Sequence, residues 1–247
     1  RAKATNTLQE WSTQDLAVPA DNAQAEGDDS VNKVITPAVR LNNRTQISSK
    51  AVGVSGTQQS VTRAGITNEL AEQVSLASME LKTDIEFSLT NNKVSAASPR
   101  KSRGLPGFVV DNVNSGAGYT AASYTGNTAG TDGTARAFTE AQFKDVLQKV
   151  YIAGGVPDVV MMGPAAKQTF STFSGNSVRQ DKGEDQKLYA AIDVYVSDFG
   201  EIKAVPNRSM RSRDVFVLQK DKLAVAYLRP FQTTPLARTG DADRRLI

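Results

Sequence analysis

The longest regular pattern of apolar and polar positions spans residues 68–92, NELAEQVSLASMELKTDIEFSLTNN. Apolar side chains recur there at steps of three and four residues, which is the period of one helix face. Asn68 or the threonine before it caps the start, and a pair of asparagines ends the segment. The pattern predicts a helix about 37 Å long, with a main stripe at Leu70, Val74, Ala77, Leu81 and Ile85. A partial second stripe indicates that the chain covers the helix on more than one side: Leu76, Met79 and Phe87.

Two extended segments precede this helix, and a polar loop separates them. Residues 5–18 and 39–56 have strand-forming composition, whereas residues 19–33 are polar and acidic in the middle. They predict a long β-hairpin arm with few apolar residues for a core of its own. Because an isolated two-stranded hairpin is marginal in water, we expect the arm to lie on the body of the protein or on a neighbouring molecule. A short helix over residues 61–65 is expected to follow the arm.

The rest of the chain mixes helices and strands. Thr139 and Gln142 form a capping-box pattern that starts a helix over residues 139–155, and Pro164 opens another after a short buried strand. Strand pairs are predicted within residues 188–210 and within 214–231, and a further strand begins after Gly240. A Gly/Thr/Ala-rich loop, which we expect to be mobile or surface-lying, spans 114–136. This order of elements predicts an α+β fold rather than an alternating α/β fold.

The composition excludes several kinds of chemistry. The 247 residues include no histidine and no cysteine, which excludes Ser-His-Asp and Cys-His catalysis, disulfides, zinc–thiolate sites and His-ligated metals. With 29 basic and 26 acidic side chains the formal net charge is +3, so bulk electrostatics do not predict a nucleic-acid binder. No apolar run suits a transmembrane helix, and no signal-peptide pattern opens the chain. Because the chain starts at Arg1 and stops in an apolar context at Ile247, we interpret both ends as incomplete.

The motifs that could carry chemistry fail on spacing or context. The stretch GPAAKQT lacks the glycine that a phosphate-binding loop needs before its lysine, since Ala166 precedes Lys167. Acidic pairs lie in polar loops rather than in the dry pockets that general acid–base catalysis requires. Basic clusters near residues 100–103, 208–213 and 244–245 have no interleaved aromatics for base stacking, and we interpret them as partners in ion pairs between subunits. We therefore predict no enzyme, no cofactor and no metal site.

Several stretches together resemble one family. They are GVSGTQQSV, NELAEQVSLASMELKTDIEFSL, RKSRGLPGF, TEAQFKDVLQKVYIAGGVPDVVMMGPAAKQTF and PFQTTPLARTGDADR. In this order, after a long two-stranded arm, they resemble the major capsid proteins (major head proteins) of tailed bacteriophages over almost the whole chain. The resemblance implies the Hong Kong 97-like (Johnson) capsid fold. Residues 1–60 would be the N-terminal arm and E-loop, 61–104 the P-domain with its spine helix, 105–210 mainly the A-domain, and 211–247 the strands that return to the P-domain.

The resemblance also implies the function and the partners. Such a protein assembles with copies of itself, in hexamers and pentamers, into an icosahedral head around double-stranded DNA that it contacts weakly. The virion would be assembled in the host cytoplasm without a membrane. The resemblance leaves open portal, scaffolding or decoration proteins as further partners. Subunit contacts are expected at the E-loop tip and at loops of the P-domain and A-domain. The expected tip residues are Asn22, Glu26, Asp28, Asp29 and Lys33, and the loop residues are Arg100, Arg103, Glu184, Asp185, Arg238, Asp241 and Arg244.

The sequence leaves three other functions open. An encapsulin-like compartment shares the capsid fold but encloses protein cargo, and no sequence feature excludes it. A small enzyme using carboxylates or Ser/Lys chemistry would need a concave pocket of convergent polar groups. Tail-tube and adhesin proteins are mostly β and would not carry the long helix.

Overall fold

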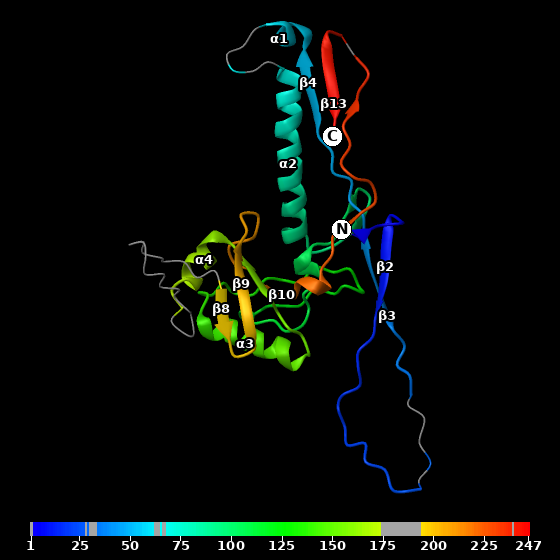
Figure 1. Cartoon of the computed structure of the whole chain (residues 1–247), viewed down its shortest axis with the longest axis vertical. Coiled ribbons are helices and arrows are strands. Elements are labelled where there is room, and N and C mark those ends of the chain that lie inside the picture. The colour runs from blue at the N-terminus through cyan, green and yellow to red at the C-terminus, as the bar shows by residue number, and fades with distance from the viewer. Residues whose placement is uncertain are drawn as a thin grey trace, which may run out of the picture.

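The computed structural model describes residues 2–27, 29, 34–61, 65, 68–173, 194–238 and 240–247. It contains two packed units and a projecting arm (Figure 1). One unit is built on the long helix α2 (Glu69–Asn91), and the other on a four-stranded sheet. The predicted mixture of helices and strands is confirmed.

Helix α2 forms where the periodic pattern predicts it. The side-chain oxygen of Asn68 accepts a hydrogen bond from the backbone N–H of Ala71 at 3.1 Å, and Asn92 ends the helix. The inner face of α2 packs on a three-stranded sheet of order β12–β13–β4, made of Thr234–Pro235, Ala242–Leu246 and Ala51–Ser55. Ala77 and Leu81 are buried there against Ile247, so the predicted main stripe is the face that the sheet covers.

The second apolar stripe of α2 has a different environment. Leu76, Met79 and Phe87 are 40%, 55% and 57% exposed, respectively. The expectation that strands of the same chain lie over this stripe is wrong, because the sheet packs only on the opposite face of the helix. An apolar stripe shows which side chains avoid water, but it does not show which molecule covers them.

The second unit contains a sheet of order β10–β7–β9–β8. Strands β7 (Val159–Met162) and β9 (Gly200–Pro206) lie parallel to each other in the middle. Strands β8 (Val194–Ser197) and β10 (Val215–Leu218) are antiparallel to their neighbours and form the two edges. The buried strand and the first strand pair predicted from the sequence are confirmed in the described residues. Residues 177–187, whose charged composition predicts a loop, lie outside them.

Two helices complete the core of this unit. α3 (Glu140–Ile152) begins with the predicted capping box, in which Thr139 and Gln142 each accept a hydrogen bond from the backbone N–H of the other. α4 (Pro164–Phe170) begins at its proline. The rings of Phe143 in α3 and of Phe170 in α4 meet edge to face, with centres 5.3 Å apart. This geometry suits the quadrupoles of two aromatic rings and joins the helices over the sheet.

The prediction of a second strand pair within residues 214–231 is wrong. Strand β10 pairs with β7, and a short 3₁₀ turn η2 (Lys220–Lys222) follows it. The next strand, β11 (Ala226–Tyr227), leaves the sheet and runs parallel to β1 (Ala2–Lys3). The local sequence correctly marks a turn at Lys220 and Asp221, but the partner of each strand is set by contacts far away in the chain.

The arm is a two-stranded ribbon with an open loop at its end. β2 (Leu8–Thr13) pairs antiparallel with β3 (Val39–Arg44), and Figure 1 shows the arm extending away from both units. The paired part is shorter than predicted, because the chain turns at its base into β4 beside α2. A short helix, α1 (Gly56–Ser60), begins at the side-chain cap of Ser55. Of residues 61–65, where the short helix was expected, 62–64 lie outside the described residues.

Short elements lead from α2 to the loop over residues 114–136. They are β5 (Ala96–Ala97), β6 (Arg100–Lys101) and the 3₁₀ turn η1 (Leu105–Gly107). The Gly/Thr/Ala-rich loop over residues 114–136 follows and carries two β-bridges, Thr120–Thr131 and Ser123–Thr128. Most of its residues are exposed or half-buried, so the loop lies on the surface. Its mobility stays a prediction.

Candidate subunit-contact surfaces

The arm carries apolar side chains that its own chain leaves uncovered. Leu16, Val18, Val34 and Ile35 are between 79% and 94% exposed. Two hydrogen bonds bridge the strands of the arm near its loop, and the one nearer the loop runs from the Gln14 side-chain amide to the carbonyl oxygen of Thr36, at 2.8 Å. Of the predicted tip contacts, Asn22, Glu26 and Asp29 are exposed, whereas Asp28 and Lys33 lie outside the described residues. This exposure is typical of a surface that another molecule covers.

The root of the arm is fixed to the body by side chains. The Asn43 amide donates to the carbonyl oxygen of Arg103 at 3.0 Å and its oxygen accepts the N–H of Arg103 at 2.8 Å. Trp11 on β2 packs on Phe108, with ring centres 5.8 Å apart. The lone tryptophan is therefore a packing anchor at the arm root, and the direction of the arm is set at this point.

Arg103, expected at a subunit contact, lies inside the chain. The residue is 2% exposed, and its guanidinium donates to the carbonyl oxygen of Tyr124 at 3.0 Å and to Oδ1 of Asn127 at 2.7 Å. The guanidinium lies 5.2 Å from the ring centre of Phe108, and its Nε has no hydrogen-bond partner among the described residues. Burial lowers the pKa of Arg103. Because no part of this side chain is left for another subunit, its expected contact is wrong, and Arg103 instead joins the arm root to the loop over residues 114–136.

Three other predicted contact residues gather on the hairpin formed by β12 and β13. Arg238 Nε lies 2.7 Å from Oδ1 of Asp243, and this carboxylate, together with the nearby Asp241, raises the pKa of Arg238. Arg244 is exposed on β13 and its stem lies over Gly53 of β4. The hairpin thus presents an exposed set of mixed charges, as expected for a surface that forms ion pairs.

The remaining predicted contact residues are not brought to that hairpin. Arg100 is half-buried in β6, near the arm root. Glu184 and Asp185 lie outside the described residues. The expected contact residues therefore belong to separate surfaces.

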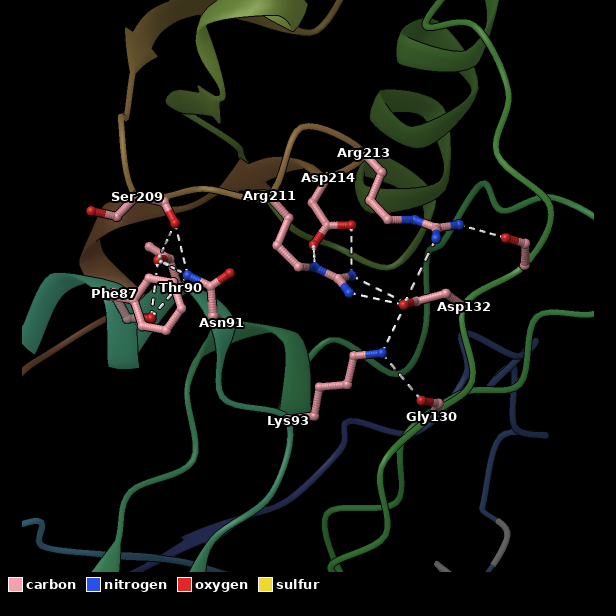
Figure 2. A network of polar contacts seen from close by, with 11 residues as sticks. Phe87, Thr90, Asn91, Lys93, Gly130, Asp132, Ser209, Arg211, Arg213 and Asp214 are labelled. Atoms are coloured by element: carbon pink, nitrogen blue, oxygen red, sulfur yellow. Dashed lines mark hydrogen bonds and ion pairs between the residues drawn. The ribbon is translucent and has the colours of Figure 1, made fainter. Parts of the chain in front are cut away.

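An ion-pair network between the two units was missed from the sequence (Figure 2). The carboxylate of Asp132, in the Gly/Thr/Ala-rich loop, accepts a hydrogen bond from Lys93 Nζ at 2.8 Å. The guanidinium of Arg211 donates to both oxygens of the same carboxylate, at 2.9 and 3.1 Å. Arg211 also bonds Asp214 at 2.6 Å, and Arg213 lies within 3.9 Å of Asp132. Hydrogen bonds from Arg211 and Lys93 hold the pKa of Asp132 well below its usual value. The network links the end of α2 to the segment that leads into β10.

A second set of hydrogen bonds between the two units lies beside this network in Figure 2. The side chains of Thr90 and Asn91, in the last turn of α2, donate to the carbonyl oxygen of Ser209 at 3.3 and 2.7 Å. These contacts join residues more than one hundred positions apart in the chain, so no local pattern marks them. Together with the network they fix the orientation of the long helix relative to the four-stranded sheet.

The described residues contain no group of three or more His, Cys, Asp or Glu side chains that could hold a metal ion. Among them, no helix combines the length and apolarity that crossing a membrane requires. A cavity of about 670 Å³ opens between the loop over residues 114–136, α3 and residues 211–217, with Asp132 and Arg211 in its wall. Five of the charged side chains in this wall pair with one another, which favours a structural role for that cluster: Lys93, Asp132, Arg211, Arg213 and Asp214.

Comparisons with known proteins point to one family. The family model described as SU10 major capsid protein matches residues 1–247. The major capsid protein of Escherichia phage Phieco32 is 25% identical over 287 residues, which covers 98% of this chain and 80% of that protein.

Solved structures share the fold. The Cyanophage Pam1 capsid asymmetric unit matches with a TM-score of 0.54 and 14% identity, over 99% of this chain and 79% of that chain. The capsid of Cyanophage P-SCSP1u matches with a TM-score of 0.51 and 9% identity, over 100% and 79%. None of these relatives favours the encapsulin-like alternative, and the expected phage capsid relationship is confirmed. Because the family match spans the whole sequence, the chain belongs to the SU10 major capsid protein family and is a structural shell protein of a phage head, a part of the virion in which copies of the chain associate with one another.

Proposed function

We propose that the chain forms an icosahedral head in which the arm of each copy lies on a neighbouring copy. The observation that carries this proposal is the arm itself, whose apolar side chains at Leu16, Val18, Val34 and Ile35 are exposed and point to no core of their own chain. A single copy leaves these side chains in water. Burying each of them against a neighbour is worth about 1.5–3 kcal/mol, and this gain is repeated at every contact of a closed shell.

The proposed assignment of the parts follows the Hong Kong 97-like fold. The ribbon β2–β3 and its loop correspond to the E-loop, α2 to the spine helix, and the sheet β12–β13–β4 to the P-domain. The four-stranded sheet with α3 and α4 corresponds to the A-domain. Because β10 pairs with β7 in that sheet, we place the end of the A-domain after Leu218 rather than at residue 210. Support comes from the separate cores of the two units and from the capsid structures that share the fold.

The proposed contacts between copies are heterologous, since an arm on one copy meets a different surface on the next. Contacts of this kind form closed rings when the rotation between copies allows it, and rings of five and six subunits close an icosahedral shell. The exposed second stripe of α2 offers a further surface that is buried only on assembly.

We also propose that the shell encloses double-stranded DNA and holds it weakly. The formal net charge of +3 over 247 residues supports a wall without a strong basic field. Fluorescence anisotropy of a labelled duplex, titrated with the purified chain at physiological salt, should show binding no tighter than about 10⁻⁶ M. A nanomolar dissociation constant would contradict the proposed weak contact.

Deletion of residues 21–33 tests the role of the arm. The deletion should leave a folded subunit, because the described residues among 21–33 lie outside both cores, but it should abolish shells in negative-stain electron microscopy. The matched control replaces the same residues with a Gly/Ser linker of equal length, which keeps the reach of the arm and its apolar side chains at Leu16, Val18, Val34 and Ile35, and should therefore still form shells. Shells formed by the deletion variant, or an unfolded circular dichroism spectrum, would contradict the proposal.

A further inference from the structure

A second part of the molecule carries exposed apolar side chains on an extended backbone. Residues 220–238, here called the strap, run from the end of β10 back to the sheet beside α2, and only β11 and β12 pair along them. Leu223, Val225, Leu228, Phe231 and Leu236 in the strap are between 37% and 45% exposed. The strap therefore has the same feature as the arm, a row of apolar side chains that its own chain only partly covers.

The strap and the arm loop have opposite charges. The strap contains four basic residues and one acidic residue, a net charge of +3. Lys220, Lys222 and Arg229 are exposed, and none of the three forms an ion pair with another described residue. The arm loop, residues 14–38, contains five acidic residues and one lysine, a net charge of −4.

The exposed stripe of α2 is a poorer partner for the arm loop. The helix contains five acidic residues and one lysine. Because Glu69 is buried and Lys50 pairs with Glu80 and Asp84, the other four acids and the two lysines leave the helix surface a net charge of −2, the same sign as the arm loop. Like charges brought together at an interface oppose binding and exclude wrong partners. The charge pattern therefore distinguishes between the two exposed apolar surfaces and favours the strap.

We propose that the strap of one copy is the surface that receives the arm loop of a neighbouring copy. The arm and the strap of the same chain are far apart, since Figure 1 shows the loop at the distal end of the arm and the strap beside the body. The contact joins apolar side chains on both segments and places the acids of the loop against the lysines and arginine of the strap. This inference rests on the proposed function and names the receiving surface.

Charge reversal tests the pairing. One variant reverses three acids of the loop, Asp15→Lys, Asp21→Lys and Glu26→Lys, and a second reverses three bases of the strap, Lys220→Glu, Lys222→Glu and Arg229→Glu. Each should raise the protein concentration needed for shell formation by at least about tenfold, which corresponds to about 1.4 kcal/mol per contact. The chain that carries all six substitutions should assemble within about threefold of wild type, because the attraction is restored with opposite sign.

A control variant separates the pairing from a change in total charge. It reverses three exposed acids that belong to neither segment: Asp111→Lys, Asp198→Lys and Glu201→Lys. The control should assemble more readily than the loop-reversed variant, although both gain the same charge. Circular dichroism and urea unfolding check that all variants fold. The proposal is overturned if both reversed variants assemble like wild type. It is also overturned if the variant with all six substitutions assembles as poorly as the two variants with three substitutions each.

Cysteine cross-linking provides a second readout, since the chain has no native cysteine. Chains with Val18→Cys are mixed with chains with Leu228→Cys under assembly conditions and treated with a flexible bismaleimide. We expect a cross-linked dimer that contains one chain of each kind. The control replaces the second chain by one with Met79→Cys in the exposed stripe of α2, which should give at least tenfold less dimer; equal or greater yield there would overturn the proposal.

The outcomes also separate this inference from the proposed function. If wild-type chains form no shells under any condition tested, the proposed function fails. If wild-type chains form shells while charge reversal and cross-linking single out another surface, the assembly stands and the strap is not the receptor of the arm.

Discussion

The substitution Asp132→Asn removes the charge at the centre of the network between the two units. The Asp132 side chain, which is 33% exposed, accepts three hydrogen bonds from Lys93 and Arg211, and Arg211 binds it in a fork. Buried charge-assisted bonds contribute about 1.5–3 kcal/mol each, whereas exposed ion pairs contribute about 0.2–1 kcal/mol. For partly exposed bonds in fork geometry we expect about 2 kcal/mol in total to be lost, since a neutral amide at this position would leave two cations facing each other.

The assay is urea unfolding followed by circular dichroism, with the free energy taken from the midpoint and slope. The pKa of Asp132 is depressed in the folded state, so its contribution is present above the unfolded pKa, about 3.9, and is lost as the pH falls toward the lower folded pKa. The stability difference between wild type and Asp132→Asn should therefore be full at pH 7 and shrink as the pH is lowered from 5 to 3.

Two controls sharpen the test. A double-mutant cycle with Lys93→Met should show coupling of at least about 0.5 kcal/mol, the lower limit for residues that share a network. The variant Asp111→Asn, at an exposed site, should stay within about 0.5 kcal/mol of wild type. A difference below that value for Asp132→Asn at pH 7, or one that does not change down to pH 3, would refute the network as a stabilising link.

Three further predictions, each with a control variant, concern the arm root, the core and the cap of α3. Arg103→Met should destabilise the chain by about 3 kcal/mol, since two hydrogen bonds and a ring contact are lost. Arg103→Lys should be destabilised as well, because one ammonium group cannot reproduce the planar, forked hydrogen bonding of the guanidinium. Urea unfolding midpoints check both variants. Leu147→Ala should cost about 3 kcal/mol by opening a cavity at a site that is 1% exposed, whereas exposed Ile152→Ala should be nearly neutral in the same assay. Thr139→Ala should lower stability by about 1 kcal/mol through the lost cap of α3, and Thr139→Ser should keep it.

Local signals in the sequence predicted the elements better than their partners. Asn68, Thr139 and Pro164 begin helices because each satisfies or avoids backbone donors within one turn, and such local physics can be read from neighbouring residues. The pairing of β10 with β7 joins residues more than fifty positions apart. A turn signal at Lys220 cannot decide such a pairing, which explains the wrong strand pair.

The contact residues were harder to predict for the same reason. Charge and a polar neighbourhood suggested that Arg103 is exposed, yet residues 124 and 127 provide oxygens that bury it. Asp132, in a stretch that looked featureless, gains its role from Lys93 and Arg211, which lie 39 and 79 positions away. The exposed stripe of α2 shows the remaining limit, because a single chain does not contain the surface that covers it.

The order in which the sheet beside α2 is synthesised has a consequence for the timing of assembly. Its middle strand, β13, ends with Leu246 paired to Ala51, and Ile247 exchanges two backbone hydrogen bonds with Lys50. On the ribosome, β4 and α2 emerge early, but the strand between β4 and β12 emerges only after residue 246 has been made. Until then the inner face of the helix at Leu81 lacks part of its cover. Nascent or truncated chains that lack β13 therefore cannot complete this unit or present its finished surface to their neighbours.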